Sequence, residues 1–155
     1  TIYQSYRLEG KFIDIELDGG EKGKSIEGTI KQIDIKSGAE EKKIAVTYFD
    51  GKFSYDNEEE ARKLWPIEKF LFQEMTLNKE VLSKFKLKDT YYNGNNGSFE
   101  IEYVVKNEQI NEFLGLEKKQ QVTLGFHGSN SNKRYYYSLT VEIDKKLDFI
   151  ERIEE

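Results

Sequence analysis

The chain has 155 residues, of which 37% are hydrophobic and 34% charged, and its net charge is −5. A chain of this length forms one hydrophobic core without disulfides or metals, and with no cysteine and a single histidine, His127, it excludes thiol catalysis, cysteine-based metal sites and two-histidine metal sites. The mildly acidic balance disfavours nucleic acid as a partner.

Residues 1–55 have the alternating pattern of β-strands. Apolar and acidic residues alternate over residues 12–17, which predicts a strand with one buried face. In the following strand the apolar phase changes near Gln32, which indicates a β-bulge or a bend. Residues 44–49 are expected to pair back as a hairpin, and Asp50-Gly51 is a tight-turn signal into a further short strand.

Residues 56–90 are expected to be a helical connection. Asn57 precedes an acidic first turn with a glutamate three residues further on, which is the pattern of a helix N-cap, and Pro66 ends that helix. The apolar residues of 78–87 fall on one helical face and predict a second helix. The apolar stretch between them, residues 70–75, favours a strand.

Residues 91–155 are expected to form a β-α-β-β half. In chain order we predict a turn at 91–98, a strand at 99–105, a strand at 122–126, a polar loop at 127–133 and a strand at 135–143. Between the first two strands, Asn107 is expected to cap a short helix that Gly115 closes. The whole chain is therefore predicted to be one α+β domain over residues 1–155, an antiparallel sheet with two or three short helices and two similar strand-rich halves.

Two loops resemble ligand-binding motifs but lack required residues. Residues 18–25 (DGGEKGKS) end like a phosphate-binding loop, yet Asp18 stands where the motif needs glycine, and a strand follows instead of a helix. Residues 93–100 (NGNNGSFE) resemble a calcium loop, but Val104 stands at the position of the required glutamate. We interpret the first as a hairpin loop and the second as a turn.

The residues able to do acid–base chemistry form no recognisable catalytic set. Glu100 and Glu102 are two apart and share the solvent-facing side of a strand, where acidic residues are common. His127 begins a polar loop near Ser129, and the sequence places neither an orienting carboxylate nor an oxyanion hole beside them. We therefore predict no catalytic residue, no metal ligand, no cofactor and no enzymatic activity.

Tyrosines are the candidates for a contact surface. In the run of three consecutive tyrosines, Tyr135 and Tyr137 are expected to face the core and Tyr136 the solvent. Tyr136, with Tyr91 or Tyr92 from a nearby turn, is suited to stack on a sugar or to anchor a protein partner. Aromatic pairing between neighbouring strands is the alternative interpretation.

The order of elements in the second half also points to a family. Residues 92–110 (YNGNNGSFEIEYVVKNEQI), a short helix and then residues 122–143 (VTLGFHGSNSNKRYYYSLTVEI) resemble the C-terminal half of the staphylococcal tandem-type lipoproteins. Residues 26–66, with the Trp65-Pro66 step, are similar to that family's central hairpin. The resemblance implies a lipid-anchored surface protein of a Gram-positive bacterium, whose signal peptide and acylated cysteine precede Thr1. That family has no established active site, so no residue inherits a role.

These observations lead to three hypotheses about function. The first is a non-enzymatic binding domain, at the cell surface or secreted, that reaches a membrane only through an upstream lipid anchor and binds an unknown protein or small molecule. The second is a carrier of an apolar molecule or sugar, with a cavity lined by rings such as Phe99, Tyr103 and Tyr137. The third, ranked last, is a hydrolase using exposed carboxylates or His127. A cytoplasmic location is the alternative to the cell surface.

Overall fold

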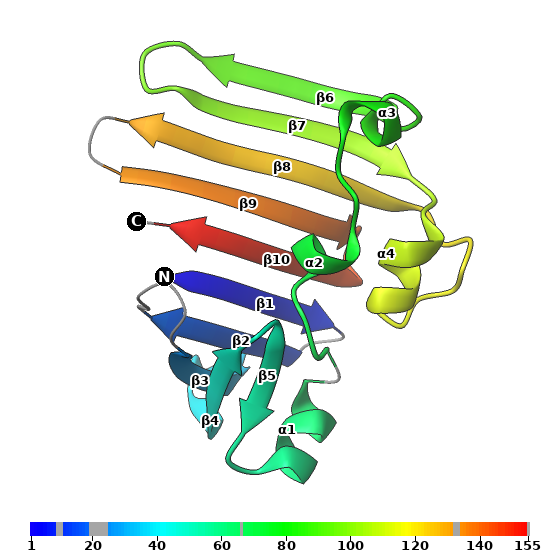
Figure 1. Ribbon diagram of the computed structural model, residues 1–155. Helices are drawn as coiled ribbons and strands as arrows, with labels where there is room; N and C mark the ends of the chain where they lie inside the picture. The colour runs from blue at the N-terminus through cyan, green and yellow to red at the C-terminus, as the bar shows by residue number, and fades with distance from the viewer. Residues whose placement is uncertain (9–10, 19–24, 66, 132–133, 155) are drawn as a thin grey trace.

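The computed structural model describes residues 1–8, 11–18, 25–65, 67–131 and 134–154. Within them, ten strands form one antiparallel sheet with four short helices beside it (Figure 1). The strands are β1 (Ile2–Leu8), β2 (Lys11–Asp18), β3 (Ile26–Asp34), β4 (Glu40–Phe49), β5 (Lys52–Tyr55), β6 (Lys86–Asn93), β7 (Ser98–Val105), β8 (Val122–Ser131), β9 (Arg134–Ile143) and β10 (Leu147–Glu154). The helices are α1 (Glu58–Leu64), α2 (Leu71–Glu74), α3 (Lys79–Leu82) and α4 (Glu108–Phe113). The antiparallel α+β class is confirmed in outline, but the residues that the structure describes are mainly β, with 56% strand and 15% helix.

The strand order explains how the chain covers its own sheet. The order is β5-β4-β3-β2-β1-β10-β9-β8-β7-β6, so β1–β5 and β6–β10 are two meanders that meet where β1 pairs with β10. Because β5 and β6 lie at opposite edges, the chain between them must cross the sheet, and Figure 1 shows it running in front of the strands. We call residues 56–85 the crossing segment; it carries α1, α2 and α3.

The sheet has two chemically different faces. The crossing segment and α4 pack on one of them, which we call the covered face, and we call the other the open face. Buried apolar side chains of the covered face include Ile15, Ile30, Leu124, Val141 and Phe149. They belong to one hydrophobic core with Trp65, Leu71 and Ile110 of the crossing segment and α4. Burial of these side chains supplies the main driving force for folding.

A buried hydrogen-bond network fastens the crossing segment to the middle of the sheet. Gln4 on β1 and Glu151 on β10 are ladder partners, and both are almost fully buried. The Gln4 amide donates to Glu151 Oε1 (2.6 Å), and its oxygen accepts from the Trp65 indole N–H (3.0 Å). The Glu151 carboxylate also accepts the backbone N–H groups of Leu71 and Phe72 at the start of α2. The network pairs polar groups that burial would otherwise leave unsatisfied.

The predicted helix caps are confirmed. The Asn57 side chain accepts the backbone N–H of Glu60 (3.2 Å) at the start of α1, and Asn107 accepts that of Ile110 (3.0 Å) at the start of α4. Gly115 follows α4 with φ +66, the left-handed conformation that glycine adopts without strain.

Two predicted irregularities of the first half are also present. The pairing of β3 with β4 changes register between Gln32 and Ile33, where the apolar phase changes in the sequence. Asp50 (φ 50) and Gly51 (φ 79) form the tight turn between β4 and β5. Local sequence patterns were sufficient to locate both.

Two predictions within the connection are wrong. Residues 70–75 contain the helical turn α2 instead of a strand, because the Glu151 carboxylate from β10 holds the N–H groups at its start. The helix expected over 78–87 is only the single turn α3, and β6 begins at Lys86, where pairing with β7 replaces the helical bonds. The result is four short helices among the described residues, where two or three were predicted.

The polar loop predicted over residues 127–133 is largely strand. β8 continues to Ser131, since its polar residues pair with β9 across the ladder, and His127 therefore lies within a strand. Residues 132 and 133 lie outside the described residues, as does most of the loop at 18–25. β3 does begin at Ile26, in agreement with the strand expected there. None of the helices that the structure describes has the length and apolar character to cross a bilayer.

Candidate binding surface

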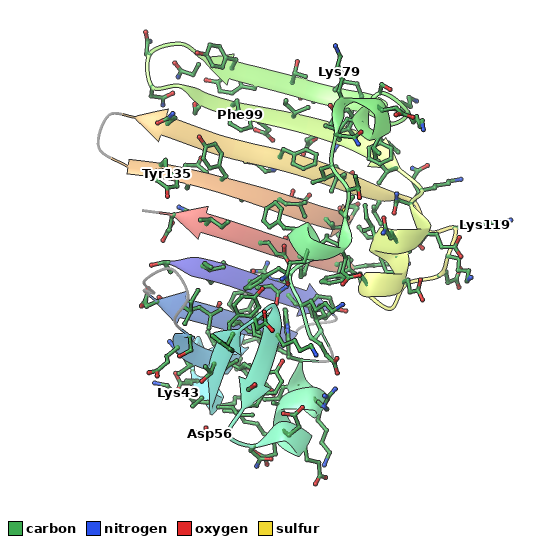
Figure 2. The ribbon with its side chains drawn as sticks, in the orientation of Figure 1. Lys43, Asp56, Lys79, Phe99, Lys119 and Tyr135 are labelled. Carbon is green, nitrogen blue, oxygen red and sulfur yellow. The ribbon has the colours of Figure 1, made fainter. Side chains whose placement is uncertain are left out.

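A row of apolar side chains crosses six neighbouring strands at one end of the covered face. The ladder registers place them side by side, from β6 to β1, in the order Tyr92, Phe99, Gly128, Tyr137, Ile153 and Ile2. We call these six residues the aromatic row. Figure 1 shows that α2, α3 and α4 lie over the other end of β6–β10, and Figure 2 labels Phe99 and Tyr135 at the end without helices. The row therefore lies on the covered face, at the end of it over which none of the described helices packs.

Gly128 determines how the rings of the row lie. A Cβ atom at Gly128 would stand 2.6 Å from Cε1 of Phe99 and 2.9 Å from Cδ1 of Tyr137. The rings from the two adjacent strands thus close over the glycine backbone, with centroids 6.3 Å apart and planes at 38°. Tyr135 extends the group, since its ring centroid is 5.8 Å from that of Tyr137 at an interplanar angle of 37°. Because Gly128 has no side chain, the rings of Phe99 and Tyr137 can approach each other and form a continuous aromatic surface.

The row remains accessible to solvent. The exposed fractions are 72% for Tyr92, 42% for Tyr137, 41% for Ile153 and 37% for the adjacent Tyr135. Together these side chains present roughly 400 Å² of mainly apolar surface, taking an aromatic side chain as about 200 Å². None of the residues in the row is charged. Contiguous apolar patches of this size on a folded domain commonly mark a contact surface.

The three tyrosines predicted as contacts are not brought together. Tyr92 belongs to the aromatic row, whereas Tyr91 and Tyr136 point to the open face. Tyr136 is half-buried under the guanidinium group of Arg152, whose Cζ lies 4.5 Å from the ring centroid. Tyr91 is 57% exposed near the edge of the sheet. Among these, only Tyr92 contributes to a cluster of exposed rings.

The prediction that Tyr135 and Tyr137 belong to the core is wrong. Alternation along β9 places both correctly on the covered face. At this end of β9, however, no described helix packs on that face, so both side chains stay exposed. Sequence reasoning therefore missed Tyr137 and Tyr135 as surface residues. The signal that could have found them is Gly128, a glycine in the middle of an alternating strand, which marks a place where neighbouring groups approach the backbone closely.

The open face brings His127 and Glu100 together but separates His127 from Ser129. His127 Nδ1 lies 3.7 Å from a Glu100 carboxylate oxygen, and its Nε2 lies 3.2 Å from Oγ1 of Thr140. The Ser129 hydroxyl instead donates to the Asn96 carbonyl oxygen (3.2 Å). A carboxylate, an imidazole and a hydroxyl therefore stand in the order of a nucleophilic triad.

This arrangement lacks two features that acyl transfer requires. Thr140 is only 7% exposed, so its hydroxyl is poorly accessible to a substrate. It also lies within β9, between β8 and β10, where backbone N–H groups are engaged in the ladders and do not form an oxyanion hole. The contacts of His127 with Glu100 and Thr140 hold these three side chains together on the open face.

Acidic groups on the same face influence each other without forming a metal site. Burial raises the pKa of Glu142, and the nearby charges of Asp148 and Glu102 raise it further. Glu102 is paired with Lys88, which lies 2.9 Å away and whose own pKa is raised by that hydrogen bond. In the part of the chain that the structure describes, no three acidic or histidine side chains are arranged to hold a metal ion.

A separate hollow lies between α3 and the first strands of the second meander. It has a volume of about 610 Å³ and is lined by Leu77, Asn78, Lys79, Leu82, Ser83, Phe85, Leu87 and Tyr103. The Tyr103 ring packs edge-on against Phe85, with centroids 6.1 Å apart. Tyr103 was expected to line a ligand cavity, and it does line this hollow, but Phe99 and Tyr137 lie in the aromatic row instead.

No protein-family model and no curated protein matches this chain. The interpretation of these surfaces therefore depends on the chemistry of the residues themselves.

Proposed function

We propose that this chain is a non-enzymatic binding domain, at the cell surface or secreted, and that the aromatic row is its contact surface. The observation that carries the proposal is the group of exposed rings of Tyr92, Tyr135 and Tyr137, which lie on the same face of the sheet as the hydrophobic core. A soluble domain gains nothing in stability from leaving such rings uncovered. Tyrosine is enriched in contact surfaces because it offers large apolar area and a hydroxyl at a small cost in side-chain entropy.

The proposed location comes from the resemblance to the staphylococcal tandem-type lipoproteins. A lipid anchor upstream of Thr1 would hold the domain at a membrane, and the helices of the domain itself would not need to enter the bilayer. The upstream reading frame tests this part directly. A signal peptide followed by a cysteine supports it, and a methionine start immediately before Thr1 with no such leader contradicts it.

The contact surface is tested with two matched double variants. Tyr92→Ser/Tyr137→Ser removes two rings from the aromatic row, and Tyr91→Ser/Tyr136→Ser removes two tyrosines from the open face. We would label both variants and the unmodified protein and measure how much of each sediments with intact staphylococcal cells. Because Trp65 is fully buried and is the only tryptophan, its fluorescence reports whether each variant is folded.

We expect the row variant to lose binding by about tenfold or more, since each ring contributes on the order of 1 kcal/mol. The open-face variant is expected to bind as the unmodified protein does. Equal binding of the two variants, or no binding by the unmodified protein, would contradict the proposal.

The absence of catalysis is tested on the residues that come nearest to a catalytic arrangement. We expect no turnover of ester, amide, phosphate or glycoside substrates that is lost in His127→Ala or Glu100→Gln. Turnover that disappears in both variants would show that the contacts among Glu100, His127 and Thr140 are catalytic and would overturn the non-enzymatic part of the proposal.

The hollow beside α3 favours a second candidate function, the carriage of a small apolar ligand. Its volume falls within the range of ligand sites, about 300–1,000 Å³, and apolar side chains such as Leu82 and Leu87 dominate its lining. We would titrate the protein with an environment-sensitive apolar dye. Dye binding that Leu82→Glu abolishes and Tyr92→Ser/Tyr137→Ser preserves supports a carrier, whereas dye binding unchanged by Leu82→Glu argues against it.

A further inference from the structure

We infer that the ligand of the aromatic row is an uncharged carbohydrate chain. This inference rests on the proposed function of the row as a contact surface and goes beyond it by naming the class of ligand. Five observations bear on it: the orientation of the rings, the length of the row, the hydrogen-bonding side chains beside it, its area and its charge.

The rings of the row are arranged as a platform. In the core, Tyr6 meets Trp65 at 89° and Phe113 meets Phe149 at 72°, whereas Phe53 and Tyr55 stack at 20°. In the row, Tyr137 is inclined by 38° to Phe99, and it is inclined by 37° to the adjacent Tyr135. Edge-on packing fills a volume, whereas rings closer to coplanar present their faces. A sugar ring carries C–H groups on its faces and hydroxyl groups at its edge, so aromatic faces are the surfaces on which it stacks.

The length of the row fits a chain of sugars. Tyr92 on β6 and Tyr137 on β9 are three strand spacings apart, which is about 14 Å at ~4.8 Å per spacing. The rings of the row stand on β6, β7 and β9, and those of Phe99 and Tyr137, on either side of Gly128, have centroids 6.3 Å apart. The row therefore offers stacking positions for an oligosaccharide and is longer than a single sugar requires.

Hydrogen-bonding side chains flank the row on both sides. Thr90 precedes Tyr92 by two residues on β6, and Asn130 follows Gly128 by two residues on β8, so each shares the face of the row. Both are exposed. A hydroxyl and an amide at these positions are suited to the hydroxyl edges of sugars stacked between them.

Area argues against a stable protein partner. The row and the adjacent Tyr135 together present roughly 400 Å², whereas a standard protein–protein interface buries about 800 Å² on each partner. An extended carbohydrate contacts its platform through one face only and does not need the larger area. The row is thus of the size that a narrow, chain-like ligand requires.

Charge selects an uncharged ligand. The residues of the aromatic row carry no charge, and the chain as a whole has a net charge of −5. An anionic polymer or an anionic bilayer binds through clustered lysine and arginine side chains, which the row does not contain. Stacking on neutral sugars needs no such cluster and is insensitive to salt.

Gly128 provides the sharpest test, because one methyl group there disturbs the platform and little else. Its backbone does not have the positive φ that alanine resists, but an added Cβ forces the rings of Phe99 and Tyr137 apart. Gly125→Ala is the matched control in the same strand. Its Cβ points to the open face and meets Thr140 Oγ1 at 2.4 Å and His127 Nε2 at 2.6 Å, away from the row.

The experiment is native affinity electrophoresis in gels that contain hydroxyethylcellulose, laminarin, xyloglucan, glycol chitin or glycogen, with and without added salt. Calorimetry with the matching oligosaccharides then gives affinities. We expect at least one neutral polysaccharide to retard the protein, independently of salt. Gly128→Ala and Tyr137→Ser are expected to weaken binding by about tenfold, while Gly125→Ala binds within about twofold of the unmodified protein.

Failure of this inference is distinguishable from failure of the proposed function. If no neutral polysaccharide binds but Tyr92→Ser/Tyr137→Ser still abolishes binding to cells, the carbohydrate inference is wrong and the contact surface stands. Binding to phosphatidylglycerol vesicles that Gly128→Ala weakens also overturns the carbohydrate inference in favour of a membrane. If the row variants alter binding to neither cells nor polysaccharides, both proposals fail.

Discussion

Glu151 is a carboxyl group in the centre of the sheet, where the core would ordinarily place an apolar residue. It accepts hydrogen bonds from Gln4, Leu71 and Phe72, which favour its ionised form. Burial opposes them and is the larger effect, raising the pKa of Glu151 to about 7. The residue that holds α2 against the sheet therefore titrates near neutral pH.

The raised pKa of Glu151 predicts that stability falls as pH rises. Between its ordinary pKa of 4.5 and the folded value of about 7, the folded state holds a proton that the unfolded state has released. The free energy of unfolding should therefore decline across this window, by ~3 kcal/mol at 1.36 kcal/mol per pKa unit. Urea denaturation at a series of pH values from 4.5 to 8, followed by Trp65 fluorescence, measures the decline.

Glu151→Gln is the matching variant, because glutamine keeps the shape and does not titrate. The pH dependence should become much shallower in this variant. Asp14 and Glu142, whose pKa values burial also raises, leave a residual slope in the same direction. A slope as steep in Glu151→Gln as in the unmodified protein would show that other groups cause the dependence.

For single residues, the sequence predicts those roles that depend on residues close by in the chain. Asn57 and Asn107 were identified as caps because the N–H groups they accept are three residues away. The role of Glu151 was not visible, since its partners Leu71 and Gln4 are 80 and 147 residues away in the chain. The exposure of Tyr137 was missed for a related reason. Alternation tells which face a side chain joins, but whether that face is covered depends on where the crossing segment runs.

Elements that depend on tertiary contacts show the same limit. The Asp50-Gly51 signal predicts the β4–β5 hairpin correctly, whereas the apolar residues 70–75 predict a strand. Part of this stretch forms α2 instead, because the first N–H groups of α2 are held by a residue of β10. β1 and β10 were not predicted at all. Gln4 and Glu151 interrupt their apolar positions with polar residues, and the interruption makes sense only once the crossing segment lies over them.

Among the described glycines, Gly28 is the one at which we expect a side chain to be tolerated least. On the covered face of β3, a Cβ atom at Gly28 would lie 1.8 Å from the backbone carbonyl oxygen of Glu16 on β2. Backbone atoms of a paired strand do not move aside as the end of a side chain does. Gly28→Ala should therefore lower the free energy of unfolding by roughly 3 kcal/mol, the upper range for overpacking.

Gly94→Ala is the control, because its Cβ would meet only the Tyr92 ring at 3.8 Å, an ordinary contact. Its stability is expected to stay within about 0.5 kcal/mol of the unmodified protein. Urea denaturation of both variants makes the comparison. Equal stabilities would mean that β2 and β3 separate easily at Gly28 and that this part of the sheet is less tightly paired than its register indicates.

Two connections join the two meanders into one molecule. One is the ladder of β1 with β10, continued by the Glu154 backbone N–H group, which donates to the Thr1 carbonyl oxygen (3.0 Å). The other is the crossing segment, anchored at Trp65 and at α2. Since Gln4 and Glu151 belong to the ladder and also bind the crossing segment, the two connections meet at the same residues. We therefore expect the meanders to unfold together in one transition.

Circular permutation separates the contributions of these two connections. The first permutant joins the chain ends by a short glycine-serine linker and opens the chain between Gly38 and Ala39, in the β3–β4 turn, where both residues are exposed. It keeps the ladder of β1 with β10 and every anchor of the crossing segment. We expect it to fold with buried Trp65 and to unfold in a single transition near the midpoint of the unmodified protein.

The second permutant uses the same linker but opens the chain between Lys69 and Phe70. This break lies between the two anchors of the crossing segment, the Trp65 indole and the N–H groups of Leu71 and Phe72. α2 then begins next to a free chain end, whose charge and mobility weaken the attachment of α2 to Glu151. The first meander keeps only the Trp65 anchor, and the second keeps only the anchor at α2. We expect a lower urea midpoint and a broader or biphasic transition, because the ladder alone must now couple the meanders. If this permutant unfolds as the first does, the β1–β10 pairing suffices to unite the sheet, and the crossing segment serves only to cover its core.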